Sequence, residues 1–128
     1  MSWQQYVDEN LIGTGNVSQA GIFGLKDGSP WATSPSFEVK SSDIKKIIAG
    51  FHDQGISLHM SGIHVAGVMY SVIKADNLSI YGKKGTSGVC IAKTEQCLVI
   101  GVYKEGIEIG NCAKTVEQMA DFLRQKNY

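Results

Sequence analysis

Capping and glycine positions near the start of the chain predict a helix. Ser2 and Gln5 match the S-x-x-Q pattern of a capping box, in which both side chains satisfy free backbone N–H groups of the first helical turn. Glycine often ends a helix, because it adopts the left-handed backbone conformation without strain. We therefore predict a helix from Trp3 to about Leu11 that stops at Gly13 or Gly15.

The apolar positions within the predicted helices have the spacing of one buried face. In the first helix, the residues expected to face the sheet are Val7 and Leu11. A second helix opens at Ser42 and Asp43, and its apolar stripe is Ile44, Ile47, Ile48 and Phe51. A last helix covers roughly residues 113–126, and its stripe is Val116, Met119, Ala120 and Leu123.

Runs of apolar and β-branched residues between short turns predict strands. The first two runs are residues 17–25 and 31–33, joined by a turn at residues 26–29. The later runs are residues 63–75, 78–81, 88–94 and 97–103. Sequential strands with short turns form an antiparallel meander. Helices at both ends of a mostly antiparallel sheet indicate an α+β fold.

Five aromatic residues do not fit these core stripes. Trp3 and Tyr6 share a strip beside the sheet-facing positions of the first helix, and Phe122 lies roughly 100° from the centre of the last helix's stripe. Tyr128 follows that helix, and Trp31 follows the turn at residues 26–29. If the terminal helices pack side by side, these rings form one aromatic groove.

An aromatic groove of this kind suits a proline-rich ligand. A polyproline II helix is already formed before binding, so it loses little entropy on docking. Its carbonyl groups have no internal partners and accept hydrogen bonds from Trp N–H and Tyr O–H groups. The spacing alone leaves a second interpretation open, in which the rings are half-buried packing between helices and sheet.

The composition bounds the class of protein. The 128 residues, 43% of them hydrophobic, predict a single globular domain. Twelve basic residues balance twelve acidic ones, so a chain-wide electrostatic interaction with nucleic acid is not expected. No apolar run approaches the ~18 residues of a membrane span, and the N-terminal residues have no secretory pattern. Three cysteines, an odd number, suit a reducing cytosol.

A local excess of lysine occurs in the second half of the chain. Between positions 74 and 94, a single acidic residue, Asp76, accompanies four lysines, which are Lys74, Lys83, Lys84 and Lys93. The cluster fits a basic surface for an acidic partner. The alternative is an ordinary solvated face with lysines at strand edges.

Enzyme motifs are weak in this sequence. The Gly- and Lys-rich residues 82–88 lack the G-x-x-x-x-G-K-[ST] order of a P-loop. The histidines and cysteines have no metal-ligand spacing, so no metal or catalytic residue is assigned. The cysteines lie among apolar residues and are expected to be small buried hydrophobic side chains.

Six segments carry a resemblance to a known family. They are M-S-W-Q-Q-Y-V-D at 1–8, L-I-G-T-G at 11–15, G-S-P-W-A-T at 28–33, I-Y-G-K-K-G at 80–85, L-V-I-G-V-Y at 98–103 and M-A-D-F-L at 119–123. With them, the chain resembles the profilin family over essentially its whole length. The resemblance implies a central antiparallel sheet, with the N- and C-terminal helices packed together on one face and shorter helices on the other.

The resemblance also implies partners. Profilins are small cytosolic proteins, associated with the cytoskeleton, that bind monomeric actin on one face and proline-rich segments, such as those of formins, on another. They also bind phosphoinositide head groups at the membrane surface, and the resemblance implies no cofactor. A monomer in a 1:1 complex with actin is expected.

By position, the resemblance assigns residues to each site. The proline-rich site is Trp3, Tyr6, Trp31, Phe122 and Tyr128. Phe122 replaces a histidine of animal members, which puts one hydrogen bond in doubt and keeps a ring for stacking. The actin contacts are Val72, Lys74, Lys83, Lys84, Ile107, Lys114 and Gln118, and the phosphoinositide contacts are Lys83 and Lys84. We expect the proline-rich and actin sites on opposite faces.

Three functional hypotheses follow from these residues and this resemblance. The leading one is a protein that holds actin monomers, presents them to proline-rich assembly factors and so regulates actin polymerisation. The second is a phosphoinositide-responsive adaptor for proline-rich peptides with little actin affinity. The third is a small enzyme on an α+β scaffold.

Overall fold

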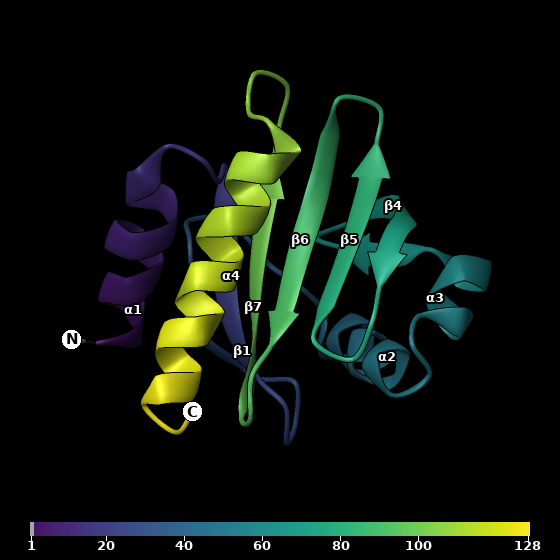
Figure 1. Cartoon of the computed structure of the whole chain (residues 1–128), viewed down its shortest axis with the longest axis horizontal. Helices are drawn as coiled ribbons and strands as arrows, with labels where there is room; N and C mark the ends of the chain where they lie inside the picture. Colours follow the sequence, from purple (N-terminus) through teal and green to yellow (C-terminus); the bar gives the residue numbers. More distant parts are fainter. Residues whose placement is uncertain (1) are drawn as a thin grey trace.

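An antiparallel sheet forms the centre of the structure (Figure 1). The computed structural model describes residues 2–128, and Met1, the first residue of the N-terminal motif, lies outside that range. Seven strands form the sheet within these residues, in the order β2-β1-β7-β6-β5-β4-β3. They are β1 (Gln19–Gly24), β2 (Pro30–Thr33), β3 (Ile63–Val65), β4 (Val68–Ala75), β5 (Ser79–Lys84), β6 (Ser87–Lys93) and β7 (Cys97–Tyr103). Strands β3 to β7 form the predicted meander, and β1 pairs with β7.

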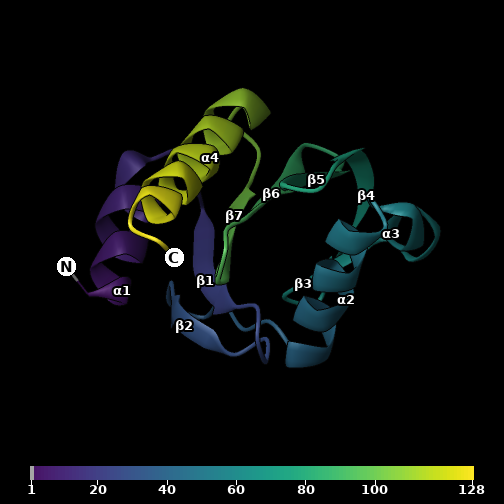
Figure 2. The same cartoon turned by 60° about the horizontal axis from the view of Figure 1, so that its bottom comes forward.

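Helices cover both faces of this sheet, as predicted. The first helical segment consists of α1 (Trp3–Gln5), a π-helical turn η1 (Tyr6–Leu11) and a 3₁₀ turn η2 (Ile12–Thr14), and it lies beside α4 (Ile109–Gln125). The other two helices are α2 (Ser41–His52) and α3 (Ile56–Ser61). Figure 2 shows α1 and α4 together on one side of the sheet and α2 and α3 on the other.

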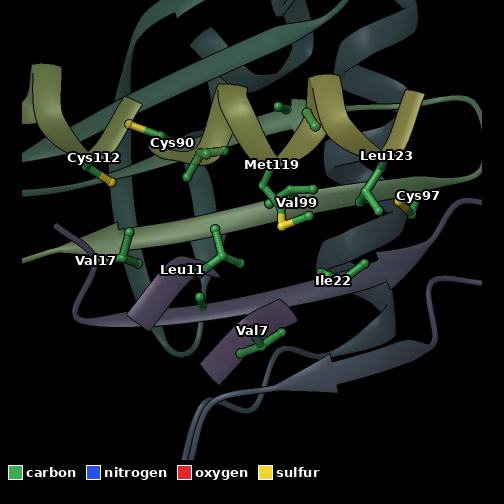
Figure 3. Close-up of a cluster of buried hydrophobic side chains, with 14 of the residues drawn as sticks. Val7, Leu11, Val17, Ile22, Cys90, Cys97, Val99, Cys112, Met119 and Leu123 are labelled. Carbon is green, nitrogen blue, oxygen red and sulfur yellow. The ribbon is translucent and has the colours of Figure 1, made fainter. Parts of the chain in front are cut away.

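Successive side chains along the central strands point to opposite faces of the sheet, and each face has its own hydrophobic core. In β7, Cys97 and Val99 face α4, whereas Leu98 and Ile100 face α2. On the α4 side, the predicted helix positions are all buried, and they are Val7, Leu11, Val116, Met119, Ala120 and Leu123. Figure 3 shows Leu11, Met119 and Leu123 converging on the strands beneath them. The two terminal helices therefore share one core, which holds them side by side.

Several elements differ from the predictions. The predicted strand at 63–75 is two strands, because Ala66 and Gly67 both have positive φ and turn the chain. Helix α3 was not predicted, since Leu58 is its only buried residue and leaves no apolar period. Helix α4 begins at Ile109, one turn before the predicted start. The first helix ends in π and 3₁₀ turns before Gly15, which has the left-handed conformation expected of a helix stop.

Within residues 2–128, no helix is both long and apolar enough to span a bilayer.

Candidate functional site

The five aromatic residues singled out in the sequence converge on one surface. The ring centroid of Trp3 lies 4.7 Å from that of Trp31, 4.9 Å from that of Tyr128 and 5.7 Å from that of Tyr6. Tyr6 in turn lies 5.6 Å from Phe122. The tilted and edge-to-face angles of these pairs are those that aromatic rings favour. We call this row of five rings the aromatic groove.

The start of the first helix fixes Trp3 within the groove. The capping box forms as predicted: the Gln5 N–H donates to the Ser2 hydroxyl oxygen over 3.2 Å, and the Ser2 N–H donates to the Gln5 Oε1 over 2.8 Å. Gln4 Nε2 donates to the carbonyl oxygen of Thr33 over 2.9 Å. This last bond ties the helix to β2, the strand that carries Trp31, and so brings the two indole rings together.

A turn between two strands fixes Tyr128. After α4, Asn127 adopts a positive φ of 68° and reverses the chain. The hydroxyl of Thr94, in the β6–β7 turn, then donates to the Tyr128 carbonyl oxygen over 2.8 Å. Gln96 adds its backbone N–H to the same oxygen, and its Nε2 donates to the carbonyl oxygen of Asn127 over 2.9 Å. The last residue of the sequence is thus anchored to the sheet.

The aromatic groove is exposed and offers free donors. Trp3, Tyr6 and Trp31 are half-buried, and Phe122 and Tyr128 are 37% and 41% exposed. The indole N–H groups of Trp3 and Trp31 donate to no acceptor within residues 2–128. Because every buried polar side-chain atom in that range has a hydrogen-bond partner, these two N–H groups reach solvent. Flat rings beside free N–H groups match the chemistry of a proline-rich ligand.

A second surface lies around Lys83 of β5, close to the start of α4. Lys83 and Ile107 line a hollow of about 520 Å³ together with Tyr103, Ile73 and Ile109, and we call it the lysine hollow. Burial raises the pKa of the Tyr103 phenol, so this ring stays neutral. Ile73 and Ile109, which are 50% and 36% exposed, were not predicted from the sequence. Ile73 interrupts the alternation of apolar and polar residues in β4, and this interruption is the one feature of the sequence that pointed to Ile73.

The remaining residues assigned to actin are dispersed around that hollow. The register of β4 against β5 shifts between Val72 and Lys74, so the two side chains lie on opposite faces of the sheet. Val72 packs toward the core under α2. The Lys74 Nζ lies 4.9 Å from the ring centroid of Tyr81 and 3.8 Å from the Asp76 carboxylate. The assignment of Val72 and Lys74 to actin binding stays a prediction, with the two residues on different faces of the sheet.

The lysine hollow and the aromatic groove lie along one helix. Both are on the side of the sheet that α4 covers, with the lysine hollow near Ile109 and the aromatic groove near Phe122, toward the other end of the helix. Lys84 is exposed on β5, and Lys114 and Gln118 are exposed on α4. Gln118 and Phe122 line one shared hollow of about 320 Å³. The lysine hollow and the aromatic groove thus lie toward opposite ends of α4.

The cysteine side chains are unsuited to catalysis. All three are free and buried, as the sequence suggested. A hydrogen bond with Cys112 and burial raise the pKa of the Cys90 thiol, and burial raises that of Cys97. Thiols with raised pKa values remain protonated and are poor nucleophiles. Within residues 2–128, no cluster of three or more His, Cys, Asp or Glu side chains could hold a metal ion.

Comparisons with known proteins agree on one family. The family model described as Profilin matches residues 1–128. Profilin-A of Physarum polycephalum is 48% identical to this chain over 128 residues, and the alignment covers 100% of both sequences. The crystal structure of Acanthamoeba castellanii profilin II superposes with a TM-score of 0.95 at 44% identity, covering 99% of this chain and 100% of that chain. Mouse profilin IIa, in complex with a double repeat from the FH1 domain of mDia1, has a TM-score of 0.83 at 24% identity, with both chains fully covered, and shows the likeness of the fold alone.

Proposed function

The chain belongs to the profilin family, and from this membership we propose that its aromatic groove binds proline-rich segments while the surface around the lysine hollow binds an actin monomer. Profilins are non-enzymatic proteins that bind actin monomers and polyproline. In this proposal, the chain is a single domain that is monomeric in the cytoplasm and forms a 1:1 complex with actin. It delivers that actin to proline-rich assembly factors.

The convergence of the aromatic rings carries the proline-rich half of this proposal. Residues 3, 6, 31, 122 and 128 come from both ends of the chain and from β2, yet their rings meet within 4.7–5.7 Å. The mouse relative in complex with formin FH1 repeats supports ligands of the same kind here. Stacking rings and free indole N–H groups supply the packing and the hydrogen bonds that such ligands need.

A fluorescence titration with decaproline tests the proposal directly. The chain has two tryptophans, Trp3 and Trp31, and both lie in the aromatic groove. We expect decaproline to quench or shift their emission along a saturable curve. A Gly-Ser peptide of the same length, which lacks the preformed helix, is the control and leaves the emission unchanged. An unaltered spectrum over a saturating range of decaproline would overturn the proposal.

The lysine hollow supports the actin half. Its lining combines the apolar side chains of Ile73, Ile107 and Ile109 with the charged residues Lys83 and Glu105. An apolar centre with a charged rim is the usual anatomy of a protein interface. Actin is an acidic partner, and rim lysines accelerate its association and fix its orientation more than they add affinity.

Charge reversal at Lys83 and Lys84 is expected to weaken actin binding roughly tenfold at low salt, because two attractive rim charges become repulsive. Added salt should narrow the difference from the wild type, since it screens exposed charges. The measurement is a titration of labelled actin monomers. Reversal of Lys45 and Lys46, an exposed pair on α2, is the matched control. Equal affinity of the Lys83/Lys84 variant and this control would refute a basic contact surface.

The same lysines are proposed to bind phosphoinositide head groups. Lys83 and Lys84 are exposed on consecutive positions of β5, and no carboxylate within residues 2–128 lies within 4.0 Å of either ammonium group. Free ammonium groups bind phosphates as point charges. Because Lys83 also lines the lysine hollow, lipid and actin should compete for it.

A further inference from the structure

The aromatic groove opens at one end into a further hollow, separate from the two described above. This hollow holds about 540 Å³ and lies between the β1–β2 turn and the β6–β7 turn. Trp31 belongs to both features, because its ring packs on Trp3 and also lines the hollow together with Leu25. A ligand that follows the groove past Trp31 therefore enters the hollow. We call this hollow the flank pocket.

The length of the ring row determines which part of a ligand reaches the flank pocket. Ring centroids are 5.6 Å apart from Phe122 to Tyr6, 5.7 Å from Tyr6 to Trp3 and 4.7 Å from Trp3 to Trp31. A polyproline II helix rises about 3.1 Å per residue, so at most about six residues cover the path from Phe122 to Trp31. The residues that follow the proline run then lie over the flank pocket.

The indole of Trp31 provides a hydrogen-bond donor at the entrance. A Cβ atom placed on Gly24 would lie 2.8 Å from the Trp31 Nε1 and 3.6 Å from the Asp27 Oδ1. Glycine at this position therefore leaves open the space beside the indole N–H, which has no acceptor within residues 2–128. A backbone carbonyl of the ligand is the matching acceptor.

The charged residues of the flank pocket determine which side chain fits it. Asp27 comes from one turn and Glu95 from the other, and no Lys or Arg nitrogen within residues 2–128 lies within 4.0 Å of either carboxylate. Hydrogen bonds from the side chain and backbone of Ser29 lower the pKa of Asp27, so it remains ionised near neutral pH. Lys26 is the cation that lines the pocket, which leaves an excess of one negative charge.

We propose that the flank pocket is a specificity subsite for a Lys or Arg residue next to the proline run of a bound ligand. This inference rests on the proposed binding of proline-rich segments in the aromatic groove. The aliphatic stem of the basic residue packs on Trp31 and Leu25, as long cationic side chains do on apolar surfaces. Its charged end then faces the carboxylates of Glu95 and Asp27.

A set of flanked peptides tests the proposal. The probes are capped decaproline, decaproline with two lysines at its N-terminal end or at its C-terminal end, and the same two peptides with glutamates. Both ends are included so that either ligand direction is sampled. At low salt, we expect one of the two lysine peptides to bind roughly 3- to 10-fold more tightly than decaproline. The gain should shrink at high salt, and the corresponding glutamate peptide should bind more weakly than decaproline.

Variants of the pocket separate the subsite from general electrostatics. Glu95→Gln should remove the lysine gain, and Lys26→Gln should enlarge it, because it removes the opposing charge. Glu38→Gln, at an exposed position between β2 and α2, is the matched control and should keep the gain. The proposal is wrong if neither lysine peptide binds more tightly than decaproline, or if the gain survives in Glu95→Gln. Failure of decaproline itself to bind the wild type would instead overturn the proposed function, and this inference with it.

Discussion

Trp3→Ala is expected to abolish binding of proline-rich peptides, with a loss of at least ~30-fold in affinity. Trp3 contacts three of the other four rings in the aromatic groove, and its removal leaves Trp31, Tyr128 and Tyr6 without their common neighbour. Central aromatic residues of an interface commonly contribute about 2 kcal/mol or more to binding. Calorimetric titration with decaproline measures the loss.

The same variant should change actin binding less than about twofold, because the lysine hollow lies toward the other end of α4. The reciprocal variant is Ile73→Ala, which should weaken actin binding and leave decaproline binding intact. Thermal unfolding of Trp3→Ala checks that the fold persists, since Trp3 also packs against the core under α4. Equal loss of both ligands in a folded Trp3→Ala protein would contradict two separate surfaces.

Gly101→Val is expected to lower the free energy of unfolding by about 3 kcal/mol, with a fall in Tm of roughly 10 °C. Gly101 lies on β7 beneath Val116 and Cys112 of α4. A Cβ atom at this position would lie 2.6 Å from the Val116 Cγ2 and 3.2 Å from the Val17 Cγ1. Both neighbours are buried in one core, so neither has free space into which it can withdraw. Chemical denaturation monitored by circular dichroism measures the change.

Gly110→Val is the matched control for this prediction. Gly110 lies in the first turn of α4, and a Cβ atom added to it would have no neighbour within 4 Å, so the same substitution there meets open space. Its unfolding midpoint should stay within a few degrees of the wild type. Because α4 carries Phe122, the Gly101 variant should also bind decaproline more weakly, whereas the Gly110 variant should not. Similar midpoints for the two variants would show that helix packing at Gly101 tolerates the added bulk.

The regular parts of the fold were predictable from the sequence. Strand β7 was predicted with its bounds at Cys97 and Tyr103, because seven apolar residues between turns can form a buried strand. The stripe from Val116 to Leu123 identified the buried face of α4, because a helix of 17 residues repeats its period several times. Helix α3 has six residues and a single buried side chain, and so it offered no period to detect.

The candidate site was predictable where residues break a pattern, and less so where backbone irregularity decides. Trp3, Tyr6 and Phe122 stood out because they lie off the core stripes of helices, and their convergence followed once those helices packed together. The shift in register near Lys74 could not be predicted, because a β-bulge depends on the pairing of two strands and not on the sequence of one. This register shift places Val72 against the core under α2 and places Ile73 in the lining of the lysine hollow.

The contacts that hold Tyr128 in the aromatic groove affect the order in which the groove forms. Tyr128 reaches the groove through hydrogen bonds to Thr94 and Gln96, which are themselves encoded far downstream of Trp3. A nascent chain on the ribosome therefore exposes Trp3 and Tyr6 long before their partners leave the exit tunnel. The aromatic groove is therefore complete only after the β6–β7 turn has folded and holds Tyr128 beside Trp3, so proline-rich ligands should bind the folded domain and not the first helix alone.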